Sequence, residues 1–206
     1  MKISYNIIIM DNTVGSLTQL QKSLIIGSIL GDGYVRIIPG RKNAFLEINH
    51  SIKAKEYVDW KYSVLMNICK SEPKERNTNN GRVAYRFFTK QNREITNLLN
   101  LFYKNGKKVI PVDLELNPIV LAVWFMDDGS NSRSNIYFNT QQFSLIDQNR
   151  LLHKLRQIGL KARLNKDKKY YRIRILKESI SKLNQIIDPY IIQSMRYKLS
   201  YDPVET

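Results

Sequence analysis

The sequence predicts an α+β fold made of two copies of one unit, because three kinds of segment recur in the same order along the chain. Apolar runs that end in Asp-Gly occupy residues 23–33 and 119–129. Strands that lead into a helical pattern begin at residues 45 and 136, and strands followed by a second helical pattern span 83–102 and 170–188. We therefore expect each unit to run helix, two strands, helix, two strands, helix. The first unit should span residues 1–112 and the second residues 113–206.

The expected strands alternate polar and apolar residues, which predicts two antiparallel sheets with one oily and one polar face. In the strand from residue 170, Arg172 and Arg174 point to one side, while Ile173 and Ile175 point to the other. Helices would cover the oily faces. The polar faces are rich in residue types that contact phosphates and base edges, although a plain solvated face is the alternative for any single strand. The candidate nucleic-acid contacts are Arg36, Arg41, Lys42, Glu47, Asn49, Arg82, Tyr85, Arg86, Arg133, Asn135, Tyr137, Asn139, Gln141, Arg163, Lys166, Lys168, Tyr170, Arg172 and Arg174.

The charge balance supports a polyanionic partner. The chain carries 33 Lys and Arg against 18 Asp and Glu, a formal charge of +15. Binding to phosphates releases counterions and so favours association with nucleic acid. A basic protein that merely avoids self-association is the alternative, and no Lys-rich amphipathic helix indicates a membrane surface. The single Cys69 excludes an internal disulfide, and the N-terminal apolar run is too short for a membrane span, so we expect a soluble, intracellular protein.

The two Asp-Gly runs raise an electrostatic question, since an acid at the C-terminal end of a helix meets the negative end of the helix dipole. Gly27 and Gly31 would let a second helix approach closely. If the two apolar helices lie side by side, Asp32 and Asp128 meet at one point and repel each other. A divalent cation between them would offset both effects, and carboxylates with open positions suit Mg²⁺.

These segments resemble the LAGLIDADG motif of homing endonucleases, with IIGSILGDG (residues 25–33) and LAVWFMDDG (residues 121–129) matching its nine positions. The stretches NTQQF, KKVIP and PYIIQSMRYKL are also similar to a yeast mitochondrial intron-encoded enzyme of this family. The resemblance covers nearly the whole chain. It implies a two-motif, single-chain monomer with pseudo-twofold symmetry, whose two sheets form a saddle on double-stranded DNA.

The resemblance also implies roles for individual residues. Asp32 and Asp128, at the eighth motif position, become the metal ligands, and the candidate metal site includes the preceding Gly31 and Asp127. Asp128 is preferred to Asp127 because it aligns with Asp32, which leaves Asp127 as a neighbouring or solvated acid. Lys108 and Lys198 match basic residues near the scissile phosphates and are candidate catalytic groups, with ordinary surface cations as the alternative.

The leading functional hypothesis is a site-specific, Mg²⁺-dependent double-strand DNA endonuclease that acts by metal-assisted phosphodiester hydrolysis. An RNA-binding maturase that assists splicing of its own intron would share the fold and the charge. A DNA-binding regulator with a degenerate nuclease core is disfavoured because both acids are present. The Lys-, Asn- and Ile-rich composition hints at an AT-rich genome, mitochondrial, chloroplast, prokaryotic or phage.

Overall fold

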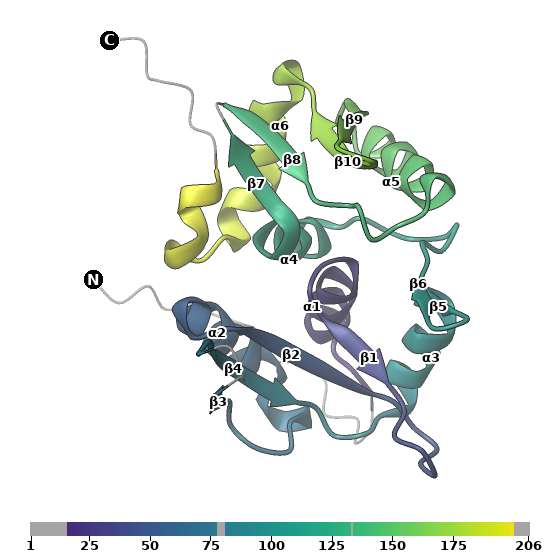
Figure 1. The fold of residues 1–206 in the computed structure, drawn as a ribbon, viewed down its shortest axis with the longest axis vertical. Coiled ribbons are helices and arrows are strands. Elements are labelled where there is room, and N and C mark those ends of the chain that lie inside the picture. The colour runs from purple at the N-terminus through teal and green to yellow at the C-terminus, as the bar shows by residue number, and fades with distance from the viewer. Residues whose placement is uncertain (1–15, 78–80, 133, 200–206) are drawn as a thin grey trace.

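A computed structural model describes residues 16–77, 81–132 and 134–199, and its elements confirm the expected duplication (Figure 1). The first unit comprises α1 (Gln19–Leu30), β1 (Tyr34–Arg36), β2 (Phe45–Ser51), α2 (Lys55–Leu65), β3 (Lys74–Asn77), β4 (Val83–Phe88) and α3 (Arg93–Phe102). The second comprises α4 (Pro118–Asp128), β7 (Gly129–Ser132), β8 (Asn135–Phe138), α5 (Leu145–Gln157), β9 (Ala162–Asp167), β10 (Tyr170–Ile175) and α6 (Lys177–Ile187).

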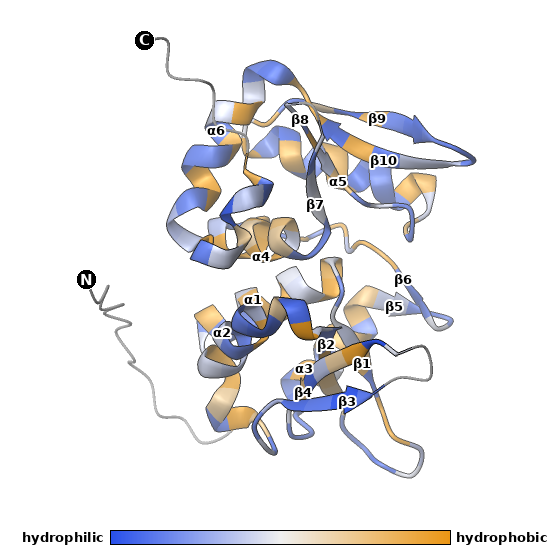
Figure 2. Cartoon of the chain, turned by 60° about the vertical axis from the view of Figure 1, so that its left-hand side comes forward, coloured by the Kyte–Doolittle hydropathy of each residue, from blue (hydrophilic) through white to orange (hydrophobic). Residues whose placement is uncertain are grey.

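Each unit contains one four-stranded antiparallel sheet, and the two sheets have equivalent strand orders. The first runs β1-β2-β4-β3 and the second β7-β8-β10-β9. Helices α2 and α3 contact the first sheet, and α5 contacts the second. The sheets lie on opposite sides of the central pair α1 and α4, and their outer strands β3 and β9 are strongly hydrophilic (Figures 1 and 2). The predicted α+β class with two antiparallel sheets is therefore confirmed.

Helices α1 and α4 form the centre of the molecule. Thr18 caps α1 through a capping box, and Asn117 caps α4 ahead of Pro118 at the first helical position. Every residue from Val120 to Met126 is buried, and α4 is orange along most of its length in Figure 2. An apolar helix of this kind requires partners on all sides, which α1, α6 and the second sheet supply. No helix within the described ranges is long and apolar enough to span a membrane.

The seam between α1 and α4 is asymmetric, as the motif sequences predict. Each glycine of α1 faces a larger residue of α4: a Cβ atom added to Gly27 would lie 2.7 Å from Cβ of Val123, and one added to Gly31 would lie 2.3 Å from Cβ of Asp127. The glycines of one helix thus accommodate the side chains of the other. This close approach explains why α1 tolerates the helix-propensity cost of interior glycine.

One element was not expected from the sequence, a short hairpin of β5 (Tyr103–Lys104) and β6 (Lys107–Lys108). Its turn residues Asn105 and Gly106 both have positive φ, the pairing that suits a two-residue hairpin loop. The connection to the second unit follows directly, and the expected boundary after residue 112 falls within it. Asp147 accepts a hydrogen bond from the backbone N–H of Ile110, and so ties this connection to α5.

The seam predicts a reversal of the usual effect of Gly→Ala in a helix. Helix propensity alone would make Gly27→Ala stabilising by about 1 kcal/mol. Because the new methyl group meets Val123, we expect a net destabilisation of about 1–3 kcal/mol, measured by urea unfolding. Introduced into a Val123→Ala background, the same change should still destabilise, because only the Cγ1 contact at 3.0 Å is removed, whereas Cβ at position 123 and the carbonyl oxygen of Val120 remain at 2.7 Å and 2.8 Å. A stabilising Gly27→Ala would contradict the tight seam.

Candidate active site

Asp32 and Asp128 lie where the two central helices end. Asp32 follows Gly31, the residue that caps α1, and its side chain is 50% exposed; Asp128 is the last residue of α4. Burial, followed by the negative charges of Asp32 and Asp127, raises the pKa of Asp128 to about 8. The acids are therefore close enough to repel each other, as the motif predicts, and the site holds negative charge that a cation would neutralise.

Two lysines approach the helix ends in equivalent ways. Nζ of Lys108, from the β5–β6 hairpin, donates to the carbonyl oxygen of Gly31 at 2.6 Å. Nζ of Lys198, from a 3₁₀ helix at Gln193–Lys198, donates to the carbonyl oxygens of Met126 and Asp127. Burial lowers the pKa of both ammonium groups, while the site's acids raise it. These are not ordinary surface cations: each satisfies carbonyls at the negative end of a helix and so offsets part of the unfavourable position of the neighbouring acid.

Asp127 is not the solvated acid that was one of the expectations. Its side chain is fully buried, and Nζ of Lys61, itself fully buried on α2, lies 2.8 Å and 3.0 Å from its two carboxylate oxygens. The ammonium group also lies 4.5 Å from the ring centroid of Tyr57. Removing one partner of such a buried pair typically costs about 3–5 kcal/mol, because the remaining charge is left uncompensated. The pair joins the first unit to the second.

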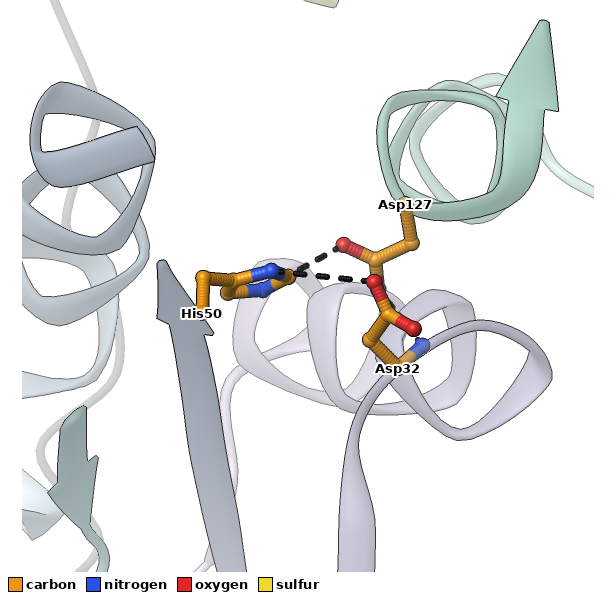
Figure 3. Close-up of side chains that lie close together, drawn as sticks. All are labelled: Asp32, His50 and Asp127. Atoms are coloured by element: carbon orange, nitrogen blue, oxygen red, sulfur yellow. Dashed lines mark hydrogen bonds and ion pairs between the residues drawn. The ribbon is translucent and has the colours of Figure 1, made fainter. Parts of the chain in front are cut away.

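The ring of His50, from β2, faces Asp32 and Asp127, which lie next to each other (Figure 3). Its Nδ1 atom is 3.6 Å from Oδ2 of Asp32, and its Nε2 atom is 3.6 Å from Oδ1 of Asp127. Burial, followed by the charge of Lys61, lowers the pKa of His50, although the two acids raise it. Asp32, His50 and Asp127 are close enough to share a metal ion. The carboxylate of Asp127 is already neutralised by Lys61, however, so Asp32 remains the available acid of this group.

Gln142 contacts the carboxylate of Asp128, as His50 contacts that of Asp32. Its Nε2 donates to Oδ2 of Asp128 and to the carbonyl oxygen of Leu30, both at 3.2 Å. Gln142 therefore connects the end of α1 with the acid of α4.

Sequence reasoning did not assign His50, Lys61 or Gln142 to the site. A signal for Lys61 was present, because it shares the helical spacing of Tyr57, Val58 and Leu65 and therefore lies on the buried stripe of α2. Gln142 lies in the NTQQF stretch that carried part of the resemblance. A lone His50 near the end of a strand carries no comparable signal.

Several of the expected nucleic-acid contacts are held in position on the polar faces of the sheets. Glu47 lies 3.4 Å from the guanidinium group of Arg36 and 3.8 Å from that of Arg86. In the second sheet, Arg174 donates to Oδ1 of Asn135, and Gln141 donates to Asp167. Asn139 lies next to the acids, because its N–H donates to the carbonyl oxygen of Asp128. The remaining exposed candidates are Arg41, Lys42, Asn49, Arg82, Arg163, Lys166, Lys168 and Tyr170.

Two tyrosines differ from the expectation. Tyr85 is buried on the same side of β4 as Phe87, and its hydroxyl group is engaged by Lys55 and Asp59, so its side chain does not lie on the polar face as expected. The alternation of β4 places Arg86, not Tyr85, on the polar face. Tyr137 is 9% exposed and lies beneath the guanidinium group of Arg172, 3.9 Å from its ring centroid, so it supports that arginine. Arg133 lies outside the described residues.

Comparison with known proteins identifies the family. The model of the LAGLIDADG DNA endonuclease family matches residues 22–183. The chain belongs to this family. The expected resemblance is therefore confirmed over most of the sequence.

Relatives of two kinds are similar to this member of the LAGLIDADG family. It is 32% identical to the cytochrome b mRNA maturase bI2 of Saccharomyces cerevisiae, over 92% of this chain and 49% of that protein, so the chain spans about half the length of that relative. It is 28% identical to a probable intron-encoded endonuclease 1 of Wickerhamomyces canadensis, over 91% of this chain and 87% of that protein. The homing endonuclease I-WcaI, solved bound to its DNA recognition sequence, superposes with a TM-score of 0.84 at 27% identity, covering 92% of this chain and 90% of that one.

The raised pKa of Asp128 predicts a pH-dependent loss of stability. In the unfolded chain this carboxyl ionises near its usual pKa of about 4, whereas in the fold it keeps its proton up to about pH 8. The folded state binds the proton more tightly, so the contribution of Asp128 to stability falls as pH rises from about 4 to about 8. Asp128→Asn should therefore exceed the wild-type Tm by a few degrees at pH 8 without divalent ions, and by less at pH 5. About 1 kcal/mol corresponds to about 2–4 °C at this chain length.

Differential scanning calorimetry would measure both proteins at both pH values. The matched control is Asp113→Asn, because Asp113 is exposed in the connection between the units. Equal Tm shifts for the two variants would contradict repulsion at Asp128.

Proposed function

We propose that this chain is a metal-dependent endonuclease that cuts both strands of double-stranded DNA at a specific, asymmetric site. The observation that carries the proposal is the meeting of Asp32 and Asp128 at the ends of two packed helices, each flanked by a half-buried lysine. Family membership and the similarity to a homing endonuclease bound to its DNA support the same activity.

The donor set fits a divalent cation, with Mg²⁺ as the preferred ion. Carboxylates and backbone carbonyls are hard oxygen ligands, and the repulsion that raises the pKa of Asp128 would be relieved by a bound cation. Asp32 and Asp128 would hold the metal, and the carbonyl oxygens of Gly31 and Asp127 are further candidates, since each has a second lone pair beyond its lysine hydrogen bond. When bound, such an ion activates water and neutralises charge on the phosphate under attack.

The lysines would stabilise the phosphate during hydrolysis. Lys108 and Lys198 are anchored to backbone carbonyls at opposite helix ends, which fixes their positions before DNA binds. A preorganised cation in a partly dehydrated site interacts strongly with the negative charge that develops on phosphate oxygens. His50 beside Asp32 and Gln142 beside Asp128 would orient those two carboxylates.

The sheets would read the DNA. Arg36, Arg86, Arg172 and Arg174 lie on the polar faces, each restrained by a neighbouring acid, amide or ring. Restrained arginines lose less conformational entropy on binding and are suited to contact phosphates or guanine edges. Since the two units carry different residues on these faces, the two halves of the target should differ in sequence.

We further propose that one chain suffices for both cuts, because both acids and both lysines belong to the same polypeptide. The active species would then be a monomer. The names of intron-encoded relatives, together with a Lys-, Asn- and Ile-rich composition typical of an AT-rich genome, favour an intron in an organellar genome as the source of this chain.

A second candidate function, assistance in RNA splicing, is favoured by the relatives named cytochrome b mRNA maturase, from Saccharomyces cerevisiae and Debaryomyces hansenii. The same positive charge would serve RNA. The two functions are separated by incubating the protein with Mg²⁺ and either a plasmid that carries the uninterrupted host sequence or the intron-containing transcript. Cleavage of the plasmid supports the endonuclease, and accelerated splicing of the transcript supports the maturase.

The decisive test removes one acid at a time. Asp32→Asn and Asp128→Asn keep the side-chain shape but remove the charge that would hold the metal, so each should reduce double-strand cutting at least 100-fold. Binding to the same DNA, measured by fluorescence anisotropy in Ca²⁺, should remain within about fivefold of wild type. The exposed Asp113→Asn serves as the control and should cut normally. Full cleavage by either acid variant would refute the assignment.

Replacing the arginines of β10 tests the DNA-binding surface. Arg172→Ala or Arg174→Ala should weaken DNA binding, and a phosphate contact would flatten the salt dependence by about one unit of slope. A contact to a base would instead relax discrimination at one position by about 1–3 kcal/mol. The matched control is Arg156→Ala on α5, an exposed arginine of the helix that covers the opposite face of this sheet. Equal effects of Arg156→Ala and the β10 variants would place this strand away from DNA.

A further inference from the structure

The buried pair of Lys61 and Asp127 requires an explanation beyond stability. Both side chains are fully buried, and burying two charges costs desolvation energy that their mutual attraction often only balances. Well-packed apolar residues of similar size would commonly serve stability as well. The reason for the pair is therefore to be sought in the contacts that Lys61 and Asp127 make with neighbouring residues.

Two contacts of Asp127 lead to Asp32, the acid of the other unit. Oδ2 of Asp127 accepts a hydrogen bond from the backbone N–H of Asp32 at 3.3 Å. Oδ1 of Asp127 lies 3.6 Å from Nε2 of His50, whose Nδ1 lies 3.6 Å from Oδ2 of Asp32 (Figure 3). Lys61 holds this carboxylate from the side of α2. The carboxylate of Asp127 thus contacts the backbone N–H of Asp32 directly, and the ring of His50 links it to the carboxylate of Asp32.

The second acid has no equivalent arrangement. The residue of α1 at the motif position of Asp127 is Gly31, which has no side chain to reach Asp128. The buried residues of α2 (Tyr57, Val58, Lys61 and Leu65) correspond, at a constant offset along the chain, to those of α5 (Asp147, Gln148, Leu151 and Leu155). Lys61 therefore corresponds to the apolar, fully buried Leu151. Within the part of the chain that the structure describes, a buried Lys–Asp pair next to a motif acid is therefore found beside Asp32 and not beside Asp128.

We propose that Asp127, held by Lys61, is a positioning residue for Asp32, and that it serves the DNA cut that depends on Asp32 and not the cut that depends on Asp128. The inference rests on the proposed function, in which these two acids act in cleavage. Loss of the pair should slow one strand selectively and convert the enzyme toward a nickase.

The test uses the full chain and a supercoiled plasmid that carries the target site, with each strand labelled separately. Single replacement of Lys61 would leave Asp127 charged and unpaired in the interior, so both partners are changed together. Lys61→Met with Asp127→Leu replaces the pair by apolar groups of similar shape and removes the acceptor for the Asp32 N–H. Lys61→Met with Asp127→Ala is the second variant, in case the leucine is not accommodated beside Gly31. Thermal unfolding and DNA binding in Ca²⁺ identify the variant that is folded and competent to bind.

The reference variants Asp32→Asn and Asp128→Asn establish which strand each acid serves. We expect the folded double variant to slow the Asp32-dependent strand at least tenfold, to leave the other strand within about threefold of wild type, and to accumulate nicked circles. Leu151→Met, at the equivalent buried position of α5, is the packing control and should show no strand bias.

The outcomes separate this inference from the proposed function. If Asp32→Asn is impaired but the double variant cuts both strands at wild-type rates, the inference alone is overturned, and the pair is merely structural. Equal slowing of both strands overturns it as well, because the effect is then not specific to Asp32. If Asp32→Asn itself cuts normally, the proposed site fails, and the positioning role fails with it.

Discussion

The close packing of α1 against α4 is the constraint on which the rest of the structure depends. Gly27 and Gly31 allow the backbone of α1 to approach Val123 and Asp127, and this approach fixes where the two helices end. Since an acid stands at each end, the seam that holds the units together also sets the separation of the acids. The sheets follow directly from the same helices, because β1 and β7 begin within a few residues of Asp32 and Asp128. One interface therefore determines both the geometry of the candidate site and the placement of the polar faces.

The electrostatics of the site follow from this geometry. Three acids and three lysines influence one another there: Asp32, Asp127 and Asp128 with Lys61, Lys108 and Lys198. Their formal charges balance, yet they are not paired evenly. Lys61 neutralises Asp127, whereas Lys108 and Lys198 bind backbone carbonyls and leave Asp32 and Asp128 without a lysine of their own. The two motif acids are consequently left for a cation to bind, and its charge would favour ionisation of Asp128, while the positive charge beside them remains available to a phosphate.

Much of this arrangement could be predicted because it depends on local periodicity. Strand alternation and the repeated Asp-Gly runs indicated the element order, and the glycines of α1 indicated a close helix partner. The exceptions have physical reasons. Tyr85 was assigned by its residue type, although the spacing to Phe87 places both on the core face. Lys61 was passed over because a lysine on a helix usually extends into solvent, and only the tertiary contact with Asp127 makes its burial favourable. Gln142 and His50 depend on contacts between segments far apart in sequence.

The asymmetry of the seam also bears on why both units belong in one chain. Two copies of the first unit would place Gly31 opposite Gly31, which would leave a gap in the seam and Lys61 buried without an acid. Two copies of the second would bring Asp127 against Asp127, each facing Leu151 where Lys61 would be needed. Both pairings bury a charge without a partner, which costs several kcal/mol of stability. The correct pairing is therefore favoured by the interior of the interface itself, and covalent linkage of the two units supplies the partners in a fixed ratio. Once the two units pair in this way, the residues on the polar faces of their sheets can differ, which the proposed recognition of an asymmetric DNA site requires.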